Sequence, residues 1–318
     1  MILFGPIPSR RLGRSLGINN IPPKCCSYSC VYCQIGRTDS MRRERSYFYS
    51  PDQIFKETAQ KILELKKLNE KVDYLSFVPD GEPTLDINLG KTIEKLKTLG
   101  IKIAVITNAS LIWDEQVRYD LLSADWVSLK IDTTDKEIWH KIDRPHGSLD
   151  LTKILSGIKE FSKQFKGRLV TETMLVKGLN DSQIVLEQTA SFIGDIQPSI
   201  AYILVPTRPP AENWVVPPDE ITLNIAYQIF VRSVKNVELL THSEGTHFTF
   251  TGDAEKDLIS ILAVHPMNKK AVKEFLDRSN NDWGMIDKLI QTNIIRQVKY
   301  NGNEYFIRNL GLKDTFAK

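Results

Sequence analysis

The sequence predicts an α/β fold: a partial (β/α)6 TIM-like barrel with a small C-terminal winged-helix-like domain. From residue 14 to about residue 242, short apolar runs alternate with longer helical patterns. Such alternation is typical of a parallel sheet with helices outside it. After Gly252 the pattern changes to three short helical segments and two alternating runs. We therefore expect two domains, over residues 1–250 and 253–318.

The predicted barrel has six strand–helix units, fewer than the eight of a complete barrel, so the sheet is either doubly wound or closed only in part. In both architectures the carboxyl ends of the strands face the ligand crevice. The first helix has a clear start, with Ser50 as a candidate cap and Pro51 at the first helical position. The predicted strands are Ser15–Ile21, Tyr74–Val78, Lys102–Thr107, Trp126–Ile131, Arg168–Val176 and Ala201–Val205, and the predicted helices are Asp52–Leu68, Ile87–Leu99, Glu115–Leu122, Leu151–Phe165, Ser182–Ile196 and Asp219–Val231.

The C-terminal segment has the composition of a small separate domain. Asn301-Gly302 lies between two alternating runs, which is a good hairpin signal. Winged-helix domains bind nucleic acid or protein, and the fold does not decide which. The predicted helices are Ala254–Ala263, Lys269–Arg278 and Trp283–Thr292, and the predicted strands are Ile294–Tyr300 and Glu304–Ile307.

Charge and hydropathy exclude some classes of protein. With 42 basic and 39 acidic residues, the formal charge is only +3, so the chain is not a strongly basic protein that coats nucleic acid, although a local basic face remains compatible. We expect no membrane span, because no run of about 18 apolar residues is present. The apolar stretch ahead of the first arginines is too short for a secretory signal. We therefore expect a cytoplasmic protein.

All four cysteines fall between Cys25 and Cys33. A disulfide framework spreads its cysteines and belongs to oxidising compartments, so this group indicates a metal site. Cys26, Cys30 and Cys33 can hold three irons of a [4Fe–4S] cluster and leave the fourth iron open. With Cys25, the spacing also matches plant-type ferredoxins, but that site needs a distant fourth cysteine. A zinc site, which prefers four ligands, and buried free thiols are also compatible with this group.

The cysteine motif Cys26-x3-Cys30-x2-Cys33, with Tyr32 before its last cysteine, resembles the radical S-adenosylmethionine superfamily. The segment Asp80-Gly81-Glu82-Pro83-Thr84 is similar to the family's Gly-Gly-Glu segment, with Asp80 in place of the first glycine. The resemblance covers about residues 10–242 and implies that the strand ends surround S-adenosylmethionine. The cofactor-binding residues that it implies are Tyr32, Gly81, Glu82, Pro83, Thr107, Asn108, Lys130, Asp132, Glu172, Thr173 and Val205.

Several of these residues also have a purely structural interpretation. Glu82 either meets the amino group of the cofactor or caps the following helix. Lys130 and Asp132 either hold the carboxylate and ribose or pair with each other. Strand alternation sends only one of Glu172 and Thr173 inward.

The family implies that the open iron chelates S-adenosylmethionine and that one electron, from a flavodoxin or ferredoxin type of donor, breaks a sulfur–carbon bond. The 5′-deoxyadenosyl radical then abstracts hydrogen from a substrate; the sequence assigns no catalytic side chain.

The substrate is inferred from further segments of the chain. The opening GPIPSRRLGRSLGIN and the run CVYCQIGRT most resemble the branch related to wyosine synthases, which rebuild a tRNA guanine. Their second cluster uses extra N-terminal cysteines that are missing here. RNA is therefore the first expected substrate and a protein or peptide the second, while an iron–sulfur sensor that binds DNA and a small-molecule enzyme are also compatible with the sequence. The loop arginines Arg37, Arg42, Arg43 and Arg45 are compatible with RNA, with a reducing partner, or with a solvated loop.

Overall fold

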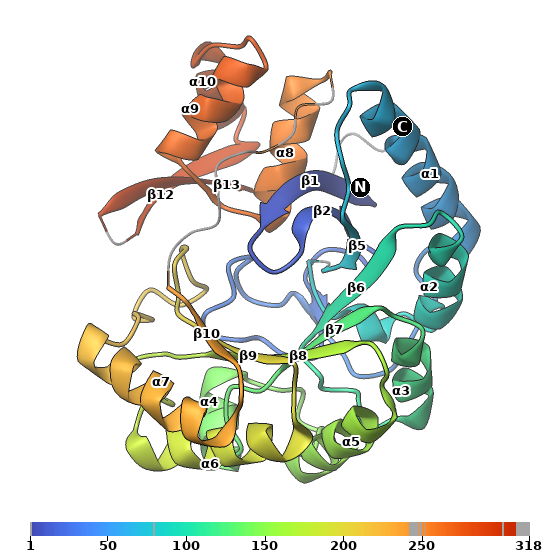
Figure 1. Ribbon diagram of the computed structural model, residues 1–318. Helices are drawn as coiled ribbons and strands as arrows, with labels where there is room; N and C mark the ends of the chain where they lie inside the picture. The colour runs from blue at the N-terminus through green and yellow to red at the C-terminus, as the bar shows by residue number, and fades with distance from the viewer. Residues whose placement is uncertain are drawn as a thin grey trace.

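The fold is built on one curved sheet with helices on its outer side (Figure 1). The computed structural model describes residues 2–78, 80–241, 248, 250, 252–300 and 302–309. Within these residues the sheet runs in the order β1-β2-β5-β6-β7-β8-β9-β10, parallel from β2 onward, with β1 antiparallel to β2. This is an α/β fold consistent with a partial barrel. The strands are β1 (Leu3–Ser9), β2 (Gly13–Ile18), β5 (Tyr74–Phe77), β6 (Lys102–Thr107), β7 (Trp126–Lys130), β8 (Arg168–Met174), β9 (Ile200–Leu204) and β10 (Val237–Leu240).

The helices of the barrel pack their apolar faces on the sheet. Ser50 caps the first of them by accepting a hydrogen bond from the amide of Asp52, as its place before Pro51 predicts. Buried apolar side chains from these helices and from the outer face of the strands form one continuous core. The helices are α1 (Pro51–Lys67), the short 3-10 helix η1 (Pro83–Leu85), α2 (Leu89–Lys97), α3 (Glu115–Leu122), α4 (Lys136–Ile142), α5 (Leu151–Gln164), α6 (Gln183–Ile196) and α7 (Glu220–Ser233).

Several elements of the barrel were not expected from the sequence, among them β1, α4 and β10. Strand β1 contains Pro6 and Pro8 and a bulge between Phe4 and Ile7, features that a strand tolerates only at the edge of a sheet. Helix α4 is only seven residues long, although Asp135 caps it. Strand β10 lies at the opposite edge and is largely exposed. Short and edge elements lack the long periodic pattern on which the prediction depends.

The C-terminal residues form a smaller module above β1 (Figure 1). Its order is α8 (Ala254–Val264), β11 (Met267–Asn268), α9 (Lys269–Arg278), α10 (Gly284–Gln291), β12 (Ile295–Tyr300) and β13 (Asn303–Arg308), with a sheet ordered β11-β13-β12. The module has its own core, against which Ile7 of β1 packs. The hydroxyls of Tyr300 and Tyr305 donate to the carbonyls of Pro206 (3.0 Å) and Thr207 (2.9 Å), so its hairpin holds the loop after β9.

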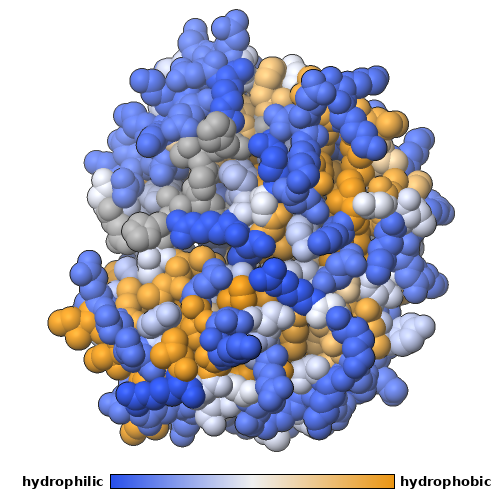
Figure 2. Space-filling model, viewed as in Figure 1, coloured by the Kyte–Doolittle hydropathy of each residue, from blue (hydrophilic) through white to orange (hydrophobic). Residues whose placement is uncertain are grey.

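The surface is mixed in character. Figure 2 shows hydrophilic side chains over most of the C-terminal module and apolar side chains over the α7 region, where Ile221 and Ile225 are exposed. No helix in the described part of the chain is both long enough and apolar enough to span a membrane.

Candidate active site

The cysteine loop between β2 and α1 is attached to the segment that follows β5. Within this loop, Cys25–Cys26 (β3) pairs with Ser40–Met41 (β4). The amide of Lys24 donates to the carbonyl of Asp80 (2.6 Å), and the amide of Glu82 donates to the carbonyl of Cys25 (3.1 Å). A Cβ on Gly81 would lie 1.9 Å from that Cys25 oxygen. Glycine is therefore required at position 81 because the two backbones touch.

Three of the four thiols form one group. Cys26, Cys30 and Cys33 interact electrostatically with one another, and burial raises the pKa of all three above their ordinary values. The Cys26 sulfur accepts hydrogen bonds from the amide of Tyr28 (3.5 Å) and from Nδ2 of Asn108 (3.5 Å). Cys25 is not part of this group of thiols. Its side chain is 2% exposed in the barrel core, and its polar neighbours are Arg42 and Ser40.

This donor set fits a [4Fe–4S] cluster. Buried thiolates are unstable without a positive group beside them, and cluster irons supply that charge to soft sulfur ligands. Within the described ranges, no three cysteine, histidine or acidic side chains converge closely enough to share one metal ion. A cluster does not require this, because each thiolate binds its own iron. Cys26, Cys30 and Cys33 are thus the residues that would hold it.

Glu82 joins β5, β6 and the cysteine loop. Its Oε1 accepts from the amide of Thr84 (3.0 Å) and from the hydroxyls of Thr84 (2.6 Å) and Thr107 (2.6 Å), and its Oε2 accepts from the amide of Asn108 (2.7 Å). The capping role is therefore realised, since Glu82 caps η1. Burial still raises the pKa of Glu82 despite these donors, and its charge acts on Cys26. Pro83, the first residue of η1, is buried, and its carbonyl accepts from Asn20 (3.0 Å).

A second polar group lies beside Cys30. The Tyr32 hydroxyl contacts Asp132 and also donates to Oδ1 of Asp143 (3.1 Å), which accepts from the Cys30 thiol (3.3 Å). The ammonium of Lys130 lies 4.7 Å from the centre of the Tyr32 ring. Burial lowers the pKa of Lys130, but Asp132 and Glu172 outweigh this and hold it above its ordinary value. Lys130 is therefore a cation next to the cysteine group.

Glu172 and Thr173, the two predicted cofactor-binding residues of β8, make different contacts, as expected for adjacent residues of a strand. Glu172 contacts Arg11 and accepts from the Ser128 hydroxyl (2.6 Å). Burial raises the pKa of Glu172, but Arg11 and Lys130 outweigh this and hold it low. The Thr173 hydroxyl instead donates to the carbonyl of Ile131 (2.8 Å). Val205 is buried directly after β9.

Two residues of this site were missed by sequence reasoning. Asp143 ends the short helix α4, and the helical spacing of Ile138, Trp139 and Ile142 after a capping Asp135 was the available signal. Burial raises the pKa of Asp143 well above its ordinary value, and Asp132 adds to this. Arg11 lies in the β1–β2 hairpin, 161 residues from its partner Glu172. No local pattern identifies such a pair.

The loop arginines differ from one another. Arg37 donates to Glu212 (2.8 Å) at the rim. Arg45 is mostly buried; it donates to the carbonyls of Thr84 (3.0 Å) and Asp86 (2.9 Å) and pairs with Asp120. Arg45 is therefore structural, whereas the Arg43 side chain remains 39% exposed.

Comparisons with known proteins agree with this geometry. The Radical SAM superfamily model matches residues 20–187. The UPF0026 protein MJ1312 of Methanocaldococcus jannaschii is 45% identical over 315 residues, covering 98% of each chain. A protein described as a probable GTP 3′,8-cyclase, from Pyrococcus horikoshii, is 26% identical over 162 residues, 51% of this chain and 47% of that protein. A radical SAM methyltransferase from Sphaerobacter thermophilus shares the fold, with a TM-score of 0.54 and 12% identity over 73% of this chain and 67% of that one.

The family model covers more than half of the chain and includes the whole cysteine motif. The chain belongs to the radical SAM superfamily and is a radical SAM enzyme, whose cofactors are a [4Fe–4S] cluster and S-adenosylmethionine.

Proposed function

We propose that this enzyme cleaves S-adenosylmethionine reductively and abstracts a hydrogen atom from RNA, as a base-modifying enzyme. The grouping of Cys26, Cys30 and Cys33 at the carboxyl ends of the barrel strands, next to Lys130, is the observation that carries the proposal. A bound cluster would supply one electron, taken from a flavodoxin or ferredoxin type of donor, for cleavage of the sulfur–carbon bond of S-adenosylmethionine. The products would be methionine, 5′-deoxyadenosine that carries the substrate hydrogen atom, and a substrate radical.

The protein binds and orients the cofactor in this scheme. Lys130 offers a cation for the carboxylate of S-adenosylmethionine, and Asp132 and Asn108 offer acceptors and donors for its ribose and amino groups. Glu82 has both oxygens occupied by Thr84, Thr107 and Asn108, so we assign it to holding the strand ends in place. Gly81, Pro83 and Tyr32 shape the same wall, and Glu172, Thr173 and Val205 continue it.

The choice of RNA is supported by two features. A distant relative is named for a nucleotide reaction. The rim beside the cysteine loop also carries Arg37, Arg42 and Arg43, and guanidinium groups pair with phosphates. The C-terminal module, whose elements alternate as in a winged helix, is assigned to substrate binding. We take residues 1–250 and 253–318 as the two domains, and the cytoplasm as the compartment, because cluster thiols persist where the surroundings are reducing.

The proposal is tested with protein reconstituted anaerobically with iron and sulfide. Reduced enzyme should release methionine and 5′-deoxyadenosine from S-adenosylmethionine. When cell-derived RNA prepared from a strain lacking this enzyme is added, deuterium should pass from labelled RNA into 5′-deoxyadenosine. Transfer from protein instead of RNA would refute the choice of substrate, and a reduced cluster that leaves the cofactor intact would refute the reaction.

A further inference from the structure

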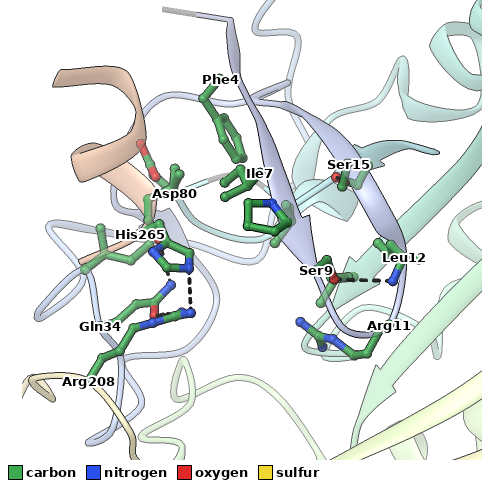
Figure 3. A pocket seen from close by; sticks show the side chains of 16 residues that line it. Phe4, Ile7, Ser9, Arg11, Leu12, Ser15, Gln34, Asp80, Arg208 and His265 are labelled. Atoms are coloured by element: carbon green, nitrogen blue, oxygen red, sulfur yellow. Dashed lines mark hydrogen bonds between the residues drawn. The ribbon is translucent and has the colours of Figure 1, made fainter. Parts of the chain in front are cut away.

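A cavity of about 130 Å³ lies between the barrel and the C-terminal module (Figure 3). It is bordered by the β1–β2 hairpin, by β5 and β6, and by Gln34 and Ile35, which directly follow Cys33. In Figure 3, Asp80, His265, Gln34 and Arg208 lie on one side of it, and Ser9, Arg11 and Leu12 on the other. The cavity therefore adjoins the cysteine loop.

The carboxylate of Asp80 is the unusual feature of this cavity. Ser76, Val78 and Asp80 all line it. Asp80 is 2% exposed, and its Oδ1 has no hydrogen-bond partner among the residues that the structure describes. Its backbone is fixed, since its carbonyl accepts from Lys24. A buried carboxylate oxygen without a partner is costly, which indicates that a bound molecule supplies one.

Other polar groups of the wall are bonded to one another. The hydroxyls of Ser15 and Ser76 are 2.5 Å apart. Arg208 donates to Oε1 of Gln34 (2.7 Å) and contacts Nε2 of His265 (2.6 Å), while Nε2 of Gln34 donates to the carbonyl of Val264 (2.7 Å). This network joins the C-terminal module to the cysteine loop. What Asp80 adds to the cavity is hydrogen-bond accepting capacity, so the bound group must be a donor.

The charge of the wall favours a neutral donor over a cation. Arg11 lines the cavity, with its charge offset by Glu172. Arg208 also lines the cavity, and Arg308 of β13 acts on Asp80 from the C-terminal module. These guanidinium groups repel an additional ammonium or guanidinium. Apolar side chains, Phe4, Ile7, Leu12 and Ile106 among them, form the remaining surface, which suits a flat heterocycle.

We propose that this cavity binds a guanine base of the substrate, with the two Asp80 oxygens accepting from the adjacent N1–H and N2–H groups. A carboxylate matches such a pair of donors because it offers two acceptor oxygens in one plane. A base drawn into a pocket is read on this edge while apolar side chains hold its faces. The inference rests on the proposed function and specifies its substrate. RNA and free guanine nucleotides present the same edge.

The test measures nucleoside binding by calorimetry. The reconstituted protein is loaded with S-adenosylmethionine but not reduced, so no turnover occurs. Guanosine should bind at least tenfold more tightly than adenosine, and inosine, which lacks the N2 group, should fall between them. Asp80→Asn should weaken guanosine binding by about 10- to 100-fold, as expected for a hydrogen bond to a charged group, and should abolish the preference over adenosine. A guanine-containing tetranucleotide and GTP, compared with guanosine, distinguish RNA from a free nucleotide.

Two controls keep the result interpretable. Asp39→Asn removes an acid from the same loop outside the cavity, where Asp39 is exposed and 3.6 Å from Lys24, and should leave guanosine binding unchanged. Ile106→Phe fills the cavity while keeping Asp80, and should weaken every nucleoside.

Equal binding of guanosine and adenosine, or a preference that survives in Asp80→Asn, would overturn the assignment. An Asp80→Asn protein whose cluster EPR signal no longer responds to S-adenosylmethionine would assign Asp80 to the cofactor and overturn it too. Absence of nucleoside binding by a protein that still cleaves S-adenosylmethionine overturns this inference alone, whereas absence of cleavage overturns the proposed function.

Discussion

Replacing Asp80 by Asn tests whether its carboxylate is buried at a cost to the fold. Burial raises the pKa of Asp80 from 3.8 to about 7, and Arg308 opposes this only in part. The folded protein therefore holds a proton between these two pH values that the unfolded chain releases. The contribution of Asp80 to folding stability therefore decreases as the pH rises from about 4 to about 7, and then levels off.

The magnitude follows from the same values. Each pKa unit corresponds to about 1.4 kcal/mol, so a rise from 3.8 to about 7 costs about 4 kcal/mol once Asp80 is ionised. Asp80→Asn removes this titration. The buried amide adds a penalty of its own, roughly 1–3 kcal/mol, but that penalty does not depend on pH. The expected signature is a difference between wild type and variant that moves by about 4 kcal/mol, in favour of the variant, between pH 4 and pH 8.

Urea unfolding of the cluster-free protein, monitored by tryptophan fluorescence under anaerobic conditions, measures this difference. Cluster-free protein is needed because cluster loss would otherwise make unfolding irreversible. Comparison with the variant removes the contributions of Glu82 and Asp143, whose pKa values are also raised by burial. Parallel stability curves for the two proteins across this pH range would show that Asp80 is not a buried, unpaired acid, and the reasoning would be refuted.

Three further predictions concern the cysteine loop. Alanine at Cys26, Cys30 or Cys33 should abolish cluster binding, measured as iron content and EPR signal, whereas Cys25→Ala should retain both; a cluster in Cys30→Ala would contradict the ligand set. Gly81→Ala places a Cβ 1.9 Å from the Cys25 carbonyl and should displace the loop and lower iron content, while Gly147→Ala, with nothing within 4 Å, should have no effect; equal iron content in the two would refute the close contact. Arg45→Ala leaves Asp120 buried without its cationic partner, although Gln116 still donates to it, and should destabilise the protein by about 3 kcal/mol. Arg43→Ala should change stability by about 0.5 kcal/mol or less, as measured by thermal unfolding; similar melting temperatures would show that Arg45 is not structural.

The parts that could be predicted from the sequence are those specified by local patterns. The cysteine motif lies within nine residues, and its spacing is compatible with a cluster that has an open iron. The resemblance to the radical SAM superfamily favoured this interpretation over a ferredoxin-type or zinc site. Helices α3 and α9 begin and end where predicted, because their apolar spacing and caps are regular. Asn108 and Lys130 lie at the ends of β6 and β7, and Glu82 lies shortly after β5, because parallel strands place their carboxyl ends at one edge. Their role in cofactor binding, like that of Glu172, stays a prediction taken from the family resemblance.

Contacts between distant segments could not be predicted. Asp143 contacts Cys30 across 113 residues, and Arg11 reaches Glu172 across 161. The role of Arg45 could not be predicted either. Its place in a basic loop is compatible with binding RNA, but in the folded protein Arg45 is buried against Thr84 and Asp86. Composition identifies the charge of such a residue, while its role depends on which chain segment folds over it.

The three residues of the segment Asp80-Gly81-Glu82 contact both the cysteine loop and the neighbouring cavity. Gly81 lets the Cys25 carbonyl approach, and the resulting bond to the Glu82 amide keeps the loop extended at β3. Extended backbone sends adjacent side chains to opposite sides, so Cys25 enters the core while Cys26 faces Glu82 and Asn108. On the same segment Asp80 lines the neighbouring cavity. A residue with a side chain at position 81 would therefore disturb the cysteine ligands and the cavity together.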